Sequence, residues 1–114
     1  SNTISNLSEA AKSHFSKFAM PSATYIDLTL GASGANYTAP ANGWIQFTTC
    51  PVTVAGYQRI DQNTDANFCV ENRVTVTEAA CIVTMPIKKG ISFKVRYDTQ
   101  GTRTFRFIYA EGEV

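Results

Sequence analysis

The chain has 114 residues, of which 44% are hydrophobic and 17% are charged, and its formal net charge is +1. This length suits one globular domain with its own core, and the composition is not that of a disordered or fibrous chain. The small net charge gives no overall field for nucleic acid, and no stretch approaches the ~20 apolar residues of a membrane helix. We therefore expect one globular domain without a nucleic-acid partner or membrane insertion.

Residues 1–20 carry the helical pattern of the sequence. Asn6 and Glu9 have the spacing of a capping box. Apolar or half-apolar residues then recur at three- and four-residue steps: Leu7, Ala11, His14, Phe15 and Phe18. Pro21 ends the pattern, because the residue before a proline avoids helical angles.

Two roles stay open for this predicted helix. It either packs on the domain that follows, or forms the end of a multi-chain stalk. In a stalk, Ile4, Leu7 and Phe18 would face partner chains, because they lie at the spacing of a short heptad pattern. The pattern spans about two heptads, which is too short to decide between the two roles.

Residues 21–114 change to a hydrophobic period of two, which is typical of half-buried strands. We expect strands at 26–30, 44–49, 52–60, 68–70, 73–76, 80–85, 91–98 and 103–110. Gly56 predicts a bend or bulge within 52–60. Short strands separated by turns predict an all-β fold, an antiparallel β-sandwich or jelly roll with a short N-terminal α-helix.

The last two predicted strands alternate most clearly and read as a hairpin. Lys94, Arg96 and Arg106 fall opposite the apolar side of that hairpin. Like charges on adjacent strands repel unless solvent or acidic groups compensate them. Asp27, Glu111, Glu113 or a neighbouring subunit are candidates for that compensation. Three interpretations remain: a solvated face, a subunit contact, or a surface that binds an anionic glycan or nucleic acid, although no RNP-like aromatic pattern supports nucleic acid.

Residues 61–67 form the longest predicted polar loop. Asp61 and Asp65, or Asp65 and Glu71, could approach each other as the carboxylate pair of a glycosidase does. Carboxylates in such loops are more commonly just solvated. The loop also lacks the glycine and the terminal glutamate of an EF-hand. We therefore predict neither a metal nor a cofactor.

The inventory of reactive side chains argues against an enzyme. His14 is the one histidine, and it is remote in sequence from every serine or cysteine of the β-domain. Cys50, Cys69 and Cys81 fit no zinc or redox spacing, so we expect free thiols. A site shared between subunits remains possible, with Asp61 or Glu71 of one chain meeting Arg73 or Lys94 of another.

Several segments resemble a known family. They include Tyr-Thr-Ala-Pro-Ala-Asn-Gly-Trp at 37–44 and Met-Pro-Ile-Lys-Lys-Gly at 85–90, together with residues 6–12, 20–22, 25–34 and 105–109. These resemble the C-terminal head domains of tailed-phage and prophage tail fibres or related virion proteins. More loosely, they resemble the C1q/TNF-like jelly roll. The middle of the chain, residues 51–84, matches no part of this pattern.

The resemblance implies a homotrimeric fibre tip, assembled in the bacterial cytoplasm and carried on the virion, whose partner is a bacterial surface glycan or protein. Residues 1–20 would join the shaft, and 21–114 would form the head. Receptor-binding candidates lie in the unmatched middle: Tyr57, Asp61, Asn63, Asp65 and Asn67. Subunit-interface candidates are Ile4, Leu7, Phe18, Arg96 and Arg106. The alternatives are a virion decoration protein that binds no receptor, a glycan-degrading enzyme and a secreted C1q-like regulator, the last disfavoured by the unpatterned cysteines.

Overall fold

The computed structural model describes residues 8, 10–11, 17–62 and 65–114, with the side chains of residues 65–67 excepted. The described residues form β1 (Pro21–Asp27), β2 (Ala35–Thr38), β3 (Gly43–Val54), β4 (Gly56–Gln62), β5 (Asp65–Val74), β6 (Cys81–Ile87), β7 (Ser92–Tyr97), β8 (Gln100–Ala110) and the 3-10 turn η2 (Glu111–Glu113). Residues 10–11 and 17–19, ahead of β1, are helical.

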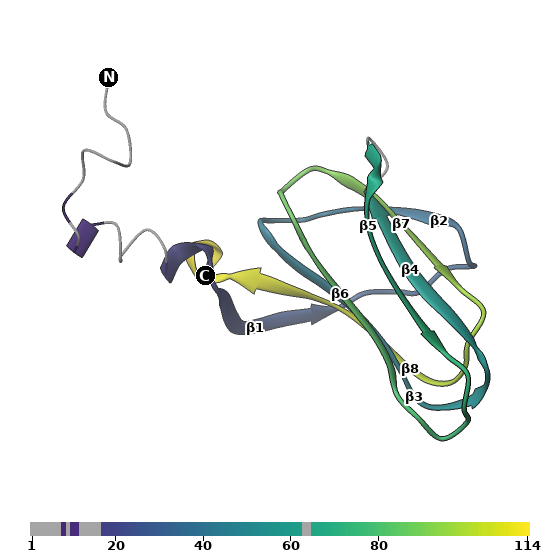
Figure 1. Ribbon diagram of the computed structural model, residues 1–114. Coiled ribbons are helices and arrows are strands. Elements are labelled where there is room, and N and C mark those ends of the chain that lie inside the picture. The colour runs from purple at the N-terminus through teal and green to yellow at the C-terminus, as the bar shows by residue number, and fades with distance from the viewer. Residues whose placement is uncertain (1–7, 9, 12–16, 63–64) are drawn as a thin grey trace.

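The strands form two antiparallel four-stranded sheets. The first sheet has the order β1-β8-β3-β6 and the second the order β2-β7-β4-β5. The sheets lie face to face as a sandwich (Figure 1). The all-β antiparallel sandwich with a short N-terminal helix is therefore confirmed. The strands also pair in a nested way, first with eighth, second with seventh, third with sixth and fourth with fifth.

The core follows directly from the alternation of side chains along the strands. In β6 every second residue is buried, beginning at Cys81, and the residues between them are exposed. The largest buried apolar side chains come from both sheets: Phe47, Phe93, Phe107, Ile45, Ile60 and Met85. Each such side chain contributes about 1.5–3 kcal/mol when it leaves water. The outward positions of both sheets are thereby left free for other roles.

A buried polar network joins the two sheets. Gln58 of β4 is fully buried, and its Nε2 donates to the carbonyl oxygens of Phe47 and Cys81, each at 3.1 Å. Its Oε1 accepts from the hydroxyl of Thr99 at 2.8 Å and also from that of Thr49. The sequence pattern gave no sign of this network, because a glutamine within a strand is usually exposed.

The last two strands are not a hairpin, so that prediction was wrong. β7 pairs with β2 and β4 in the second sheet, whereas β8 pairs with β1 and β3 in the first. Their apolar sides still face each other, since Phe93 and Val95 of β7 and Phe105 and Phe107 of β8 are all buried between the sheets. The predicted alternation was right, but residues 98–99 cross from one sheet to the other.

The middle of the chain also differs from the prediction. The strands expected at 68–70 and 73–76 form one continuous strand, β5, which ends at Val74. β4 extends to Gln62, and its ladder with β5 reaches the pair Gln62–Asp65. The expected polar loop at 61–67 is therefore the end of a β4–β5 hairpin. The strand expected at 52–60 is divided at Ala55, next to the predicted bend.

Helical residues 17–19 ahead of β1 and the C-terminal turn η2 lie together at one end of the sandwich (Figure 1). The Glu111 N–H donates to the Met20 carbonyl at 2.7 Å, which fixes η2 against the segment before β1. The helix cap seen in the described residues runs from the Ala11 N–H to Ser8 Oγ at 3.1 Å. Ser8 therefore supplies the side-chain acceptor that is typical of an N-cap.

Candidate functional site

Two of the predicted receptor-binding residues lie on the outer face of the second sheet. Tyr57 and Asp61 point outward from β4, two strand periods apart, and Arg59 lies between them on the same face. Asn63 lies outside the described residues. Asp65 and Asn67 belong to β5, but their side chains are not among those described.

Asp61 is not the solvated loop carboxylate that the sequence suggested. It is 6% exposed, and its two oxygens accept from Arg59 Nε at 2.6 Å and from Arg96 Nη1 at 3.1 Å. The hydrogen bond and the charge of Asp61 raise the pKa of the Arg59 guanidinium above its usual value. Glu71 joins the same network, 3.7 Å from Arg59 and 3.0 Å from Arg73.

Arg59 was missed in the sequence analysis, although a signal was present. Tyr57, Arg59 and Asp61 alternate with buried Gln58 and Ile60, so the period of two places all three on one face. The Arg73 guanidinium lies over the Tyr57 ring, 5.2 Å from its centre, which adds a cation–π contact to the network. One chain thus brings together the acids and cations that the sequence suggested might meet between subunits.

The predicted patch of Lys94, Arg96 and Arg106 does not exist as one surface. Lys94 and Arg96 point outward from β7 in the second sheet, whereas Arg106 points outward from β8 in the first. They therefore lie on opposite sides of the sandwich. The acid that compensates Arg96 is Asp61, which the sequence analysis had not considered for this part.

The outer face of the first sheet has a different character. Registered pairs place one apolar row across all four strands: Tyr25, Ile108, Trp44 and Pro86. In the neighbouring row Asp27 lies opposite Arg106, whose guanidinium stacks over the Tyr25 ring at 4.3 Å. The Nε of Arg106 is buried and has no hydrogen-bond partner in the described part of the chain. This face thus has one apolar row beside a mostly polar row, in which Gln46 and Thr84 accompany Arg106, and its charges are close to neutral.

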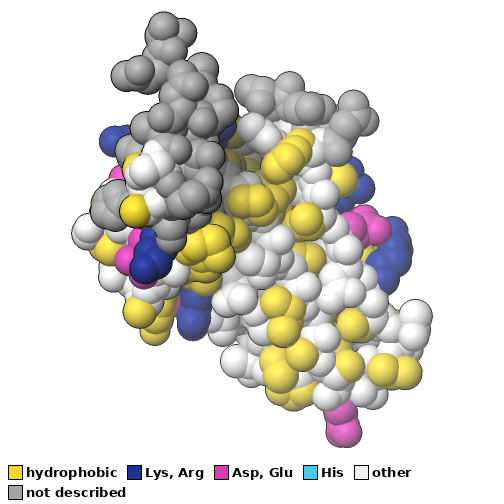
Figure 2. Space-filling view, turned by 60° about the vertical axis from the view of Figure 1, so that its left-hand side comes forward, with side chains coloured by type: hydrophobic (Ala, Val, Ile, Leu, Met, Phe, Trp, Pro, Cys, Tyr) yellow, Lys and Arg dark blue, Asp and Glu magenta, His cyan; other side chains and the backbone are white. Residues whose placement is uncertain are grey.

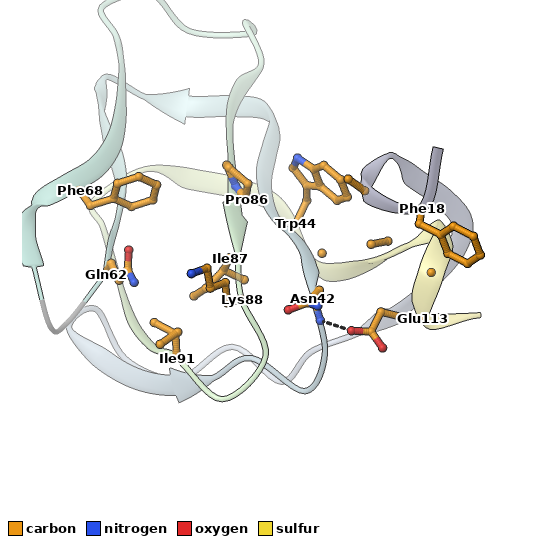
Figure 3. Close-up of a pocket in the computed structure, with 14 residues that line it drawn as sticks. Phe18, Asn42, Trp44, Gln62, Phe68, Pro86, Ile87, Lys88, Ile91 and Glu113 are labelled. Atoms are coloured by element: carbon orange, nitrogen blue, oxygen red, sulfur yellow. Dashed lines mark hydrogen bonds between the residues drawn. The ribbon is translucent and has the colours of Figure 1, made fainter. Parts of the chain in front are cut away.

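A groove of about 1030 Å³ continues from this face toward the end of the sandwich. Figure 3 shows Trp44 and Phe18 on the side of the groove near Glu113, and Phe68 and Gln62 on the opposite side. The carboxylate of Glu113 accepts from the Asn42 backbone N–H at 2.8 Å. Seen with this end turned forward, hydrophobic side chains occupy the middle of the surface and charges gather at its edges (Figure 2).

Of the predicted interface residues in the N-terminal segment, Ile4 and Leu7 lie outside the described residues. Phe18 is 45% exposed, and its ring lies close to the Gly112 backbone, so that a Cβ on Gly112 would press on it. Phe18 therefore packs in part on its own chain and presents the remaining surface to solvent.

The described residues contain little that could support covalent or metal chemistry. No three His, Cys, Asp or Glu side chains among them gather as around a metal ion. Cys50, Cys69 and Cys81 are free thiols, and burial raises the pKa of the Cys81 thiol. His14 lies outside the described residues. No helix of the described part has the length and apolar character to cross a membrane.

Comparisons with known proteins give no match for this chain: no family model, no curated protein and no solved structure matches it.

Proposed function

We propose that this chain is a non-catalytic attachment domain, the homotrimeric head of a tail fibre or related virion protein that attaches to a glycan or protein on a bacterial surface. The observation that carries the proposal is the apolar row on the first sheet. As in other fibre tips, assembly would take place in the bacterial cytoplasm and the domain would be carried on the virion.

The nested strand order supports a jelly roll. Pairs one–eight and three–six in one sheet, with two–seven and four–five in the other, are what result when one long antiparallel ribbon is folded over on itself. This is the architecture implied by the resemblance to fibre heads and C1q/TNF-like domains.

The outer face of the first sheet is suited to contact another copy of the chain. Tyr25 on β1 is 49% exposed and Pro86 on β6 is exposed, so the apolar row reaches solvent at both edges of the sheet. Contiguous exposed apolar surface commonly marks a protein–protein contact. The face is enriched in aromatic residues and arginine, as interface cores are. Because its two charges are opposite and adjacent, copies of the face can meet without like-charge repulsion.

Attachment is favoured over catalysis by the state of the carboxylates. Glycoside hydrolysis needs two carboxyl groups that are accessible to the substrate. Asp61 is buried beneath two arginines, and Glu71 is held by Arg59 and Arg73. Neither carboxylate is placed to exchange a proton with a substrate.

The test of assembly is light scattering after gel filtration. The wild-type chain is expected to elute with the mass of a trimer. Ile108→Glu places a charge in the centre of the apolar row and is expected to give monomers, with Ile82→Glu as a second variant at a more exposed position. Val76→Glu is the matched control, because Val76 is 63% exposed in the turn between β5 and β6. A monomeric wild type contradicts the proposal.

The test of attachment uses fluorescently labelled protein on a panel of bacterial strains. Decoration of some strains and not others supports a receptor-binding head. A trimer that decorates no strain favours a structural decoration protein. Release of reducing ends from surface glycans would instead support the glycan-degrading enzyme.

A further inference from the structure

The outer face of the second sheet carries a continuous chain of charged side chains. In order of contact they are Arg96, Asp61, Arg59, Glu71 and Arg73. Lys94 belongs to the same face, since it is the direct cross-strand partner of Asp61. These six side chains carry four positive and two negative charges, and the carboxylate of Asp98, which accepts from the Tyr57 N–H, borders them at the end of β7.

The most exposed charged side chains of this face are cations. The Asp61 side chain is 8% exposed and those of Arg59 and Glu71 are 29% and 30% exposed, whereas that of Arg96 is 44% and that of Arg73 is 68% exposed. A molecule approaching from solvent therefore meets Arg96 and Arg73 first. Arg59 and Arg96 are also directly opposite each other on adjacent strands. Such a like-charge pair is unfavourable without the acid that bridges it.

The arginines retain unused donors in fixed positions. A guanidinium has five N–H donors in a rigid fork. Arg73 and Arg96 each use one nitrogen in their contacts with Glu71 and Asp61. Arg59 uses two nitrogens, one toward each acid. Because these contacts already hold the side chains in place, an added anion would cost less side-chain ordering. The remaining forks match the paired oxygens of carboxylate, phosphate or sulfate groups.

We propose that this face binds an anionic polysaccharide, one that carries carboxylate or phosphate groups along its chain. The cations are spread over β7, β4 and β5, across roughly 10 Å at the usual strand spacing. A single small anion cannot contact Lys94 and Arg73 together, but a polymer with repeated anionic groups can. The inference depends on the proposed attachment function and names its site and the class of its receptor.

Two features of the face favour a sparsely charged polysaccharide over nucleic acid. Asp61 and Glu71 lie within the patch and would repel a densely charged phosphate backbone. Binding of single-stranded nucleic acid also uses several aromatic rings as stacking platforms. This face offers Tyr57, whose ring already has the Arg73 guanidinium above it.

The test is titration calorimetry of the full chain with defined probes. These are polygalacturonate as a carboxylate polymer, a poly(glycerol phosphate) as a phosphate polymer, neutral dextran and a single-stranded oligonucleotide. One or both anionic polysaccharides are expected to bind, more weakly as salt is raised, while dextran does not. If no polysaccharide binds, or if the oligonucleotide binds more tightly than both polymers, the inference is overturned.

Variants locate the binding on this face. Lys94→Gln with Arg73→Gln removes two cations that do not contact Asp61, and leaves Glu71 its contact with Arg59. Affinity is expected to fall by about twofold to thirtyfold, given ~0.2–1 kcal/mol for each exposed ion pair and two cations lost. The matched control is Lys88→Gln with Lys89→Gln, which removes the same charge outside this face and is expected to change affinity less than about twofold. Equal losses in the two double variants would overturn the inference.

A gain-of-function variant gives a readout that a structural role would not produce. Glu71→Gln removes an acid and raises the charge of the face, while the amide oxygen can still accept from Arg73 and hold it in place, so polysaccharide affinity is expected to increase. Weaker or unchanged binding contradicts the inference. The assembly and cell-labelling experiments fail independently of this one: a trimer that decorates cells equally well with Lys94→Gln and Arg73→Gln refutes this face but leaves the attachment function standing.

Discussion

The buried network around Gln58 offers a quantitative test of the fold. Gln58→Met keeps the length of the side chain but removes its polar atoms. The structure assigns four hydrogen bonds to those atoms, two to the carbonyls of Phe47 and Cys81 and two from the hydroxyls of Thr49 and Thr99. At about 1 kcal/mol for each bond, the substitution removes roughly 4 kcal/mol.

Part of that loss is recovered. A methionine buries more apolar surface than a glutamine, which returns roughly 1 kcal/mol. The hydroxyls of Thr49 and Thr99 keep their mutual contact at 3.1 Å, so they are not left entirely without partners. The expected net cost is therefore about 3 kcal/mol, a large fraction of the ~5–15 kcal/mol that stabilises a typical domain.

The assay is urea denaturation at a fixed protein concentration, followed by the fluorescence of Trp44, the single tryptophan of the chain. Gln100→Met is the matched control, because Gln100 is exposed at the start of β8, and it is expected to cost less than about 0.5 kcal/mol. Adding Thr49→Val and Thr99→Val to Gln58→Met should restore part of the loss, since apolar replacement of both partners is nearly neutral. A cost for Gln58→Met below about 1 kcal/mol, or one equal to the control, would refute the reasoning.

Three further outcomes follow from individual residues. Asp61→Asn is expected to lower the free energy of unfolding by about 2 kcal/mol, because two arginines lose the acid they share. An unchanged free energy of unfolding in the same urea assay would contradict the ion pairing. Gly43→Ala is expected to destabilise the protein more than Gly90→Ala, because a Cβ at Gly43 would overlap a backbone carbonyl oxygen of β8. Open space surrounds Gly90, so the substitution there costs only the ~1–2 kcal/mol of its positive φ of 81°. The reverse order of melting temperatures would exclude the close approach at Gly43. Burial raises the pKa of Cys81, so less of it is present as the reactive thiolate. A thiol reagent at about pH 8 should therefore modify the exposed Cys50 first and the buried Cys81 only after unfolding. Equal modification rates of the two cysteines by mass spectrometry would contradict the burial of Cys81.

Residues 61–67 show a case in which the sequence pattern predicted the wrong local structure. The run of Asp, Gln, Asn and Thr is polar, and polarity alone suggested a loop. In the structure Asp61 and Gln62 extend β4, because Asp61 is compensated by arginines from its own strand and from β7. A strand can include a buried carboxylate only when such partners exist, and one of them, Arg96, lies 35 positions from Asp61 in the sequence.

The candidate site was predicted in part. Tyr57 and Asp61 were both among the predicted receptor-binding residues, but Asp61 was expected in a loop. The structure places both on β4, and Arg59 between them could have been added from the alternation along the strand. Trp44 appeared in the sequence analysis only as the end of the segment 37–44 that carries the family resemblance. Its place in an apolar row with Tyr25, Ile108 and Pro86 required the register of four strands, and register depends on long-range pairing.

The sequence by itself determined the direction of side chains within each strand. A period of two leaves little freedom for which side chains face inward, because shifting the pattern by one residue would expose the whole core. On that basis the apolar side of the last two strands was assigned to the core, and its residues are buried: Phe93, Val95, Phe105 and Phe107. Only the tertiary structure decided which strands lie side by side, since strand pairing joins residues far apart in the chain and leaves little local trace. The strand pairing places β7 and β8 in different sheets, and this separates Arg96 from Arg106. One predicted basic patch thereby became a charged face on the second sheet and an almost neutral, apolar face on the first.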